Sequence, residues 1–218
     1  MTSSPTDQLI DQLAADARPV RPLRAPAVRA LMALAAIFTA AAVAVAWSGD
    51  VAGLVARYAG REALLALEMA AMSATAIAAV VGAFTLSIPG RSRRWIAAPV
   101  PFFAGWLLVS GVGCYGDFVR RGGAELEVGE SLNCLSFILA TSAILAPFLV
   151  WRLARAKPID PLPVALLGGL GVAASSAFVL QFFHPFTVTF IDLAVHLFAI
   201  LVVVGTMGVL NRRTLALA

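Results

Sequence analysis

The feature that most constrains this chain is a succession of six apolar runs, each long enough to cross a bilayer as a helix. A helix of about 20 predominantly apolar residues spans the hydrocarbon core and satisfies its own backbone hydrogen bonds there. Short alternating strands of the kind that build a membrane barrel are not evident in the pattern. We expect spans at approximately residues 28–47, 64–88, 95–112, 134–151, 162–183 and 188–210. The predicted fold class is an all-α integral membrane protein with six transmembrane helices.

Composition supports a bilayer as the surroundings of this chain. Of its 218 residues 61% are hydrophobic and 13% charged, whereas a soluble domain is about 45–50% apolar and about 25% charged. The net charge of +4 does not indicate nucleic-acid binding, because the basic residues fall in short clusters without a basic face interleaved with aromatics. The first apolar run begins near Val28, behind a polar segment, so we expect a retained span rather than a cleaved signal peptide.

The distribution of Lys and Arg predicts the orientation. Twelve of the sixteen basic residues lie in the two terminal segments and in the connections on the same side of the predicted bundle. The opposite connections hold four: Arg57, Arg61, Arg120 and Arg121. Cytoplasmic loops carry the excess of Lys and Arg, so both termini are expected in the cytoplasm, which an even number of spans requires. We therefore divide the chain into a cytoplasmic segment, residues 1–27, and a transmembrane domain, residues 28–218.

A few polar or ionisable side chains fall within the spans or at their ends. An ionisable group at mid-bilayer costs about 2.5–3.5 kcal/mol, so each such residue calls for a reason. The predicted topology places them all in the outer half, around a long outer loop expected over residues 113–133. We take these six as candidate sensing residues: Glu68, Cys114, Cys134, His184, Asp192 and His196.

Two kinds of sensing chemistry fit these residues. Cys114 and Cys134 could form a disulfide that closes the outer loop, provided that they face an oxidising periplasm. Alternatively, Cys134, His184 and His196 with Asp192 offer soft ligands for a transition metal. Their spacing is not diagnostic of a metal, so the metal remains unknown and no other cofactor is expected.

Structural roles remain open as alternatives for several of these residues. Asp192 and His196 are four residues apart on one helical face and can stabilise their own helix. Glu68 can reach the outer interface, and Cys134 can serve as a small buried hydrophobe.

Other classes of protein are less favoured by the sequence. A nucleotide-binding glycine loop, catalytic-triad spacing, a CxxC pair and HExxH are not found, so no enzymatic activity is expected. The main alternative is a small transporter or channel that uses Glu68, Asp192 and His196. Transport predicts polar residues through the whole depth of the bundle, whereas here they stop in the outer half.

The polar segment before the first span predicts a short amphipathic helix. At 100° per residue, apolar side chains occupy one arc of about 140°. The members of this arc are Leu9, Ile10, Leu13, Ala14 and Ala17. Ser4 followed by Pro5 predicts an N-cap with proline at the first helical position, and Pro19 is expected to end the helix.

Such a helix, of about 14 residues, is marginal in water and needs a surface on which to bury its apolar face. A membrane surface favours Lys and Arg on the polar face, but that face carries Asp7, Asp11 and Asp16. An acidic face is disfavoured beside an anionic leaflet. A protein partner is therefore favoured over lipid.

The segment LIDQLAADARPVRPLRAP resembles the N-terminal motif of NrsF-type anti-sigma factors, which are bacterial six-helix membrane proteins. The matching positions are Asp16, Pro19, Val20, Leu23 and Pro26. The resemblance continues through the Pro-Gly turn after the second span, NCLSF at the start of the fourth, a glycine-rich fifth span with His-Pro near its end, and the final LNRR. It covers nearly the whole chain, and the combination of motifs carries it.

The resemblance implies regulation rather than catalysis. Proteins of this family hold an extracytoplasmic-function sigma factor at the inner membrane through the cytoplasmic N-terminal segment and release it under stress. The implied partner-binding residues are Leu9, Ile10, Leu13, Asp16, Pro19, Val20 and Leu23. Cys134 matches a family cysteine, whereas His184 stands about where its usual partner cysteine is expected. Neither the inducing signal nor the oligomeric state follows from the sequence.

Overall fold

The computed structural model describes residues 4–16, 22–120, 128–183 and 189–214, and within these ranges the regular secondary structure is helical. The elements are α1 (Pro5–Ala15), α2 (Pro26–Ser48), α3 (Val51–Arg57), α4 (Glu62–Leu86), η1 (Arg93–Ala97), α5 (Val100–Arg120), α6 (Val128–Ala154), α7 (Pro161–Leu180) and α8 (Phe190–Thr214). Among the described residues, six helical segments are long and apolar enough to cross a membrane: α2, α4, η1 with α5, α6, α7 and α8. The predicted six-helix membrane fold is confirmed.

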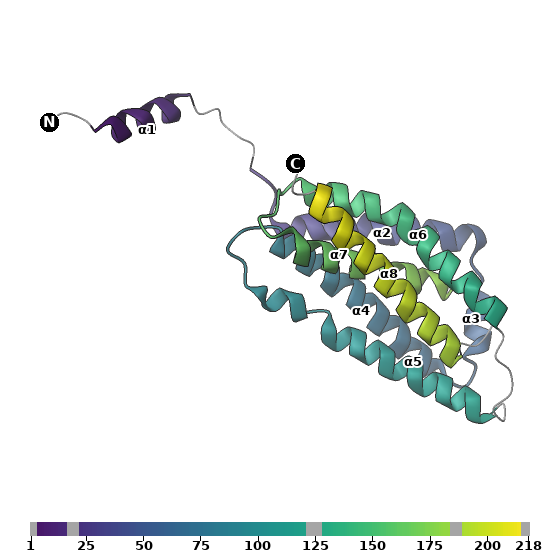
Figure 1. Ribbon diagram of the computed structural model, residues 1–218. Helices are drawn as coiled ribbons and strands as arrows, with labels where there is room; N and C mark the ends of the chain where they lie inside the picture. Colours follow the sequence, from purple (N-terminus) through teal and green to yellow (C-terminus); the bar gives the residue numbers. More distant parts are fainter. Residues whose placement is uncertain (1–3, 17–21, 121–127, 184–188, 215–218) are drawn as a thin grey trace.

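The centre of the bundle is α7, which packs against α4, α6 and α8 (Figure 1). Its sequence is buried over 72% of the span, against 17–33% for the other five. Small residues make this position possible. A Cβ added at Gly169 would lie 2.9 Å from the Cα of Val204 in α8, and one at Gly171 would lie 2.7 Å from Cγ2 of Val80 in α4. The two glycines therefore set how closely α7 approaches its neighbours.

The third span is longer than predicted, because with η1 included it runs from Arg93 to Arg120. The sequence indicates residues 95–112, whereas a 3₁₀ turn, η1, comes first and α5 then continues to Arg120. Much of the loop expected over residues 113–133 is helical instead, because α6 also begins early, at Val128. Beyond the predicted end of the span, Tyr115, Phe118 and Val119 remain apolar and exposed on the helix surface, as suits a helix that continues along lipid.

The short helix α3 was not predicted. It begins after Asp50, whose side chain accepts a hydrogen bond of 2.7 Å from the backbone N–H of Gly53 and so caps the helix. The backbone N–H of Asp50 donates to the carbonyl of Phe182, just beyond α7. These contacts hold α3 across the end of the bundle opposite α1. We call the two ends of the bundle the α3 end and the α1 end.

Helix α1 projects from the end of the bundle at which α2 begins and α8 ends (Figure 1). As predicted, Ser4 is its N-cap and Pro5 its first residue, and Asp7 completes a capping box with Ser4. The helix stops at Ala15, earlier than the end expected before Pro19. Asp16 is the C-cap, where a negative charge is unfavourable at the carbonyl end of the helix dipole.

Candidate functional site

The buried carboxylate of Glu68 organises the α3 end of the bundle. The Tyr58 hydroxyl donates to its Oε2 at 2.7 Å, and the Ser110 hydroxyl donates to its Oε1 at 2.8 Å. Nε2 of Gln181 approaches the same Oε1 at 3.5 Å. We call these four residues the Glu68 cluster. It joins α4 to α5, to the end of α7 and to the turn after α3. Burial, together with the adjacent carboxylate, raises the pKa of Tyr58 far above its usual range, so this hydroxyl stays a donor.

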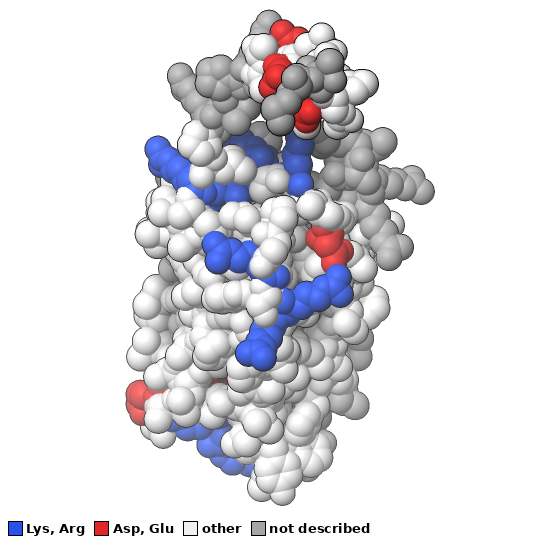
Figure 2. Space-filling view, turned by 90° about the vertical axis from the view of Figure 1, so that its left-hand side faces the viewer, with Lys and Arg blue, Asp and Glu red and all other residues white. Residues whose placement is uncertain are grey.

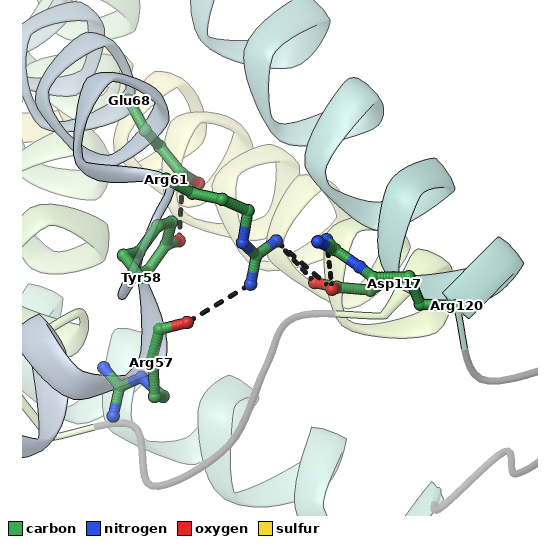
Figure 3. A network of polar contacts seen from close by, with 6 residues as sticks. All are labelled: Arg57, Tyr58, Arg61, Glu68, Asp117 and Arg120. Atoms are coloured by element: carbon green, nitrogen blue, oxygen red, sulfur yellow. Dashed lines mark hydrogen bonds and ion pairs between the residues drawn. The ribbon is translucent and has the colours of Figure 1, made fainter.

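A second set of polar contacts ties the α3 turn to the end of α5 (Figure 3). Arg61 Nη1 lies 3.2 Å from both carboxylate oxygens of Asp117, and Arg120 Nη2 lies 2.8 Å from one of them. Arg61 also donates to the carbonyl of Arg57, whose own guanidinium donates to the carbonyl of Gln181 at 2.7 Å. Burial lowers the pKa of Arg57. Three of the four basic residues that the sequence assigned to outer connections, Arg57, Arg61 and Arg120, thus act as structural ties, and Arg121 lies outside the described residues.

A cavity of about 20 Å³ lies between these two sets of contacts. Its lining includes Glu68, Cys114, Asp117 and Arg61. A cavity of that volume accommodates about one water molecule. The geometry therefore fits a hydrated polar junction between helices.

The two cysteines lie on different helices. Both are buried and neither is in a disulfide: Cys114 lies in α5 beside the Glu68 cluster, and Cys134 lies near the start of α6 in the hydrophobic core. The helices α5 and α6 do not pack extensively against each other, and Figure 1 draws α8 between them. The structure thus does not join the two thiols, and the disulfide stays a prediction.

Asp192 and His196 both stabilise the first turns of α8. The Asp192 carboxylate accepts hydrogen bonds of 2.8 Å from the backbone N–H and the hydroxyl of Thr189, while the Asp192 N–H donates to that hydroxyl. This is a capping box. Nδ1 of His196 lies 2.6 Å from the carbonyl oxygen of Asp192. Because a carbonyl oxygen can only accept a hydrogen bond, Nδ1 is the ring nitrogen that carries a hydrogen in this contact. The helix-stabilising role considered for this pair is what the geometry supports.

The metal hypothesis is not supported by the described part of the chain. Within it, no group of three or more His, Cys, Asp or Glu side chains could hold a metal ion. His184 lies outside the described residues, so the ligand set that includes it remains a prediction. Glu68, Asp192 and His196 gather toward the α3 end instead of spreading through the bundle, and this arrangement does not favour a transport path.

Arg29 is a buried polar residue that sequence reasoning counted only as a topological charge. It lies in the first turns of α2 and is 6% exposed. Its Nη2 donates to the carbonyl of Arg152 at 3.1 Å, its Nη1 lies 3.5 Å from the Ser87 hydroxyl, and its guanidinium lies 5.1 Å from the centre of the Phe84 ring. Its position inside an apolar run was the sequence feature that could have indicated a buried, hydrogen-bonded arginine. Arg29 ties the start of α2 to α4 and α6.

The apolar face predicted for α1 is exposed. Leu9, Ile10 and Leu13 are 54%, 57% and 64% exposed, and no residue of α1 is buried. Asp16 and Leu23 are exposed as well, whereas Pro19 and Val20 lie outside the described residues. Figure 2 shows acidic side chains on the projecting segment and basic side chains gathered on the bundle below it. An unburied apolar stripe with an acidic reverse face fits a protein-docking element.

Fold and site together define a multi-pass membrane protein with six apolar helices and a projecting amphipathic helix. The family model NrsF, negative regulator of sigma F, matches residues 13–216, nearly the whole chain, and the chain belongs to this family. The resemblance found in the sequence is thereby confirmed, and membership in a regulator family points to a non-enzymatic role. Comparisons with curated proteins and with solved structures give no match.

Proposed function

We propose that this protein is a membrane-bound anti-sigma factor. It holds an extracytoplasmic-function sigma factor at the bacterial inner membrane through residues 1–27 and releases it on an envelope, oxidative or metal stress signal. The observation that carries the proposal is the exposed apolar face of α1, in a chain of the negative regulator of sigma F family.

The chemistry of α1 favours a protein as its partner. Leu9, Ile10 and Leu13 offer an apolar ridge without burying it on the bundle. The aspartates on the other face are repelled by anionic lipid and attracted by a basic rim around an apolar groove. The capping box preorganises a helix of only 11 residues, which reduces the conformational entropy lost on docking.

The proposed orientation of the protein in the membrane places α1 on the same side as the sigma factor. With both termini in the cytoplasm, α1 lies where a sigma factor is found, and the excess of Lys and Arg at the α1 end favours that side. Residues 16–25 connect α1 to α2, and we call them the tether. Leu23 and the prolines of the tether extend the proposed binding segment toward α2. A sigma factor held this close to the bilayer is kept from RNA polymerase.

Release requires that a change at the candidate sensing residues, near the α3 end, affect the sigma-factor-binding segment at the α1 end. The helix α4 offers a connection, because Glu68 lies near its start while Phe84 and the following Ser87 contact Arg29 at the other end. Arg29 comes three residues after Pro26, where the tether enters α2. Rearrangement at Glu68, Cys114, Cys134, His184, Asp192 or His196 is proposed to shift α4 and so alter how α1 is presented.

The test uses the full-length protein in membranes with the sigma factor encoded beside it. Leu13→Asp places a charge on the apolar ridge, and Ala15→Asp places the same charge on the polar face as a matched control. Burial of one leucine contributes about 1.5–3 kcal/mol, so Leu13→Asp is expected to weaken co-purification about 10- to 100-fold and to raise expression of a sigma-dependent reporter. Wild-type binding and repression in Leu13→Asp would refute the proposal.

A further inference from the structure

A groove of about 640 Å³ opens on the surface of the bundle between the start of α5 and α8, with α7 as its floor. Phe103, Leu166 and Leu201 contribute to its apolar lining, and Leu201 is 69% exposed. It exists because α5 packs on α4 and meets α8 near the α3 end, where the rings of Phe118 and Phe190 are 6.3 Å apart. Toward the α1 end α5 leaves α8 uncovered.

One end of this groove is polar. Arg93 of η1 and Asp160, the N-cap of α7, line it there, and Arg93 Nη2 lies 2.7 Å from Asp160 Oδ2. Their side chains are 79% and 48% exposed, and an ion pair so exposed contributes only about 0–1 kcal/mol. Arg93 uses one of its five N–H donors in this pair. It can therefore share its charge with a second anion.

The polar end also has the residue types that are typical of the lipid-headgroup level. Arg93 is flanked by the exposed Arg91 and Arg94, and Trp95 in the same turn is 37% exposed. Tryptophan and clustered arginine mark the membrane–water interface at the ends of spanning helices. Figure 2 shows basic side chains gathered on this end of the molecule. The lining of the groove thus changes from residues typical of the headgroup level to apolar side chains of the predicted spans.

We propose that this groove is a binding site for an anionic phospholipid. An acyl chain lies along α7 between α5 and α8, and the phosphate accepts hydrogen bonds from Arg93. A guanidinium presents paired donors that match phosphate oxygens, and basic pockets between transmembrane helices bind anionic headgroups. A zwitterionic lipid fits the apolar part equally well but gains less from three neighbouring arginines. The site is independent of the partner that α1 binds.

The experiment measures lipid retention by the full-length protein. Protein purified in mild detergent is mixed with phosphatidylglycerol or phosphatidylcholine, and bound lipid is counted by native mass spectrometry. Arg93→Gln removes the headgroup contact, and Leu201→Trp fills the groove. Arg155→Gln is the matched charge control, because Arg155 lies at the same end but over the ring of Trp151. Leu108→Trp, at a residue 71% exposed on α5, is the matched size control.

Wild type is expected to retain one phosphatidylglycerol in preference to phosphatidylcholine. Arg93→Gln should weaken that retention about fivefold, the effect of one basic residue at an anionic membrane surface, and Leu201→Trp should weaken it at least as much. The two control variants should retain lipid as wild type does. Because Arg93 and Leu201 are both exposed, neither change is expected to impair folding.

Several outcomes would overturn the proposal. Equal retention of the two lipids, or equal losses in Arg93→Gln and Arg155→Gln, would reduce the effect to general surface charge. Displacement of the lipid by excess inorganic phosphate would show a site for a free anion. A protein dimer that is lost in Leu201→Trp, with unchanged phosphatidylglycerol retention, would assign the groove to a second copy of the chain.

Discussion

Replacing Glu68 tests whether hydrogen bonds to its carboxylate hold the α3 end of the bundle together. Two hydroxyl donors, from Tyr58 and Ser110, reach this side chain at 2.7 and 2.8 Å, and only 5% of the residue is exposed. Glu68→Ala removes the acceptor and leaves a void. Glu68→Gln keeps the shape and one carbonyl oxygen, and its amide can donate to the Tyr58 oxygen.

The expected magnitudes follow from these partners. A buried donor left without an acceptor costs about 1–3 kcal/mol, so two such donors and the void lower the free energy of unfolding by about 3 kcal/mol in Glu68→Ala. Glu68→Gln keeps an acceptor and loses only the extra strength that the negative charge gives to the hydrogen bonds, about 1 kcal/mol. For a chain of this size each kcal/mol shifts the thermal midpoint by about 2–4 °C. We therefore expect the midpoint to fall by about 6–12 °C in the first variant and about 2–4 °C in the second.

The assay is thermal unfolding of the full-length protein in detergent, followed by circular dichroism. Leu67→Ala is the control, because Leu67 precedes Glu68 in α4 and its side chain is 58% exposed. That variant should unfold within about 2 °C of wild type. Equal midpoint losses in Glu68→Ala and Glu68→Gln would refute the reasoning, because the acceptor would then not matter.

Three further predictions address other parts of the molecule. Gly169→Ala should lower the free energy of unfolding by about 1–3 kcal/mol, because its Cβ meets the backbone of α8, whereas Gly205→Ala, with open space around it, should be neutral or stabilising in the same thermal assay. Arg29→Met should cost about 1.5–3 kcal/mol through the lost charged hydrogen bonds, and a wild-type midpoint would contradict its structural role. Ser4→Ala should reduce the helicity of α1, measured by NMR Cα shifts, and leave the thermal midpoint of the bundle unchanged; a lowered midpoint would mean that α1 contributes to the bundle.

Local patterns proved sufficient for the start of α1. The N-cap at Ser4 and the proline at the first helical position depend on neighbours within one turn, so the sequence predicted them correctly. The end of the helix was placed too late, since the prediction considered Pro19 and not the unfavourable charge of Asp16 at the C-cap. The family was likewise evident from motifs spread along the chain, as the match over residues 13–216 confirms.

The Glu68 cluster could be predicted only in part. The cost of a carboxylate within an apolar helix singled out Glu68 itself. Its partners Ser110 and Gln181 are 42 and 113 residues away along the chain, and no local pattern indicates which helices bring them to Glu68. Arg29 was missed for the opposite reason, because a basic residue beside a predicted loop satisfies the positive-inside rule without any contact being considered.

By itself, the sequence determined the six apolar helices, because hydrocarbon admits few ways of satisfying a backbone and only runs of this length and composition provide one. It also determined the amphipathic face of α1, which depends on the helical period alone. The tertiary structure decided which helix lies at the centre, which polar side chains meet at the α3 end, and that a groove opens beside Arg93. Those features depend on how closely helices distant in sequence approach one another, and that approach is set by side-chain packing across the bundle.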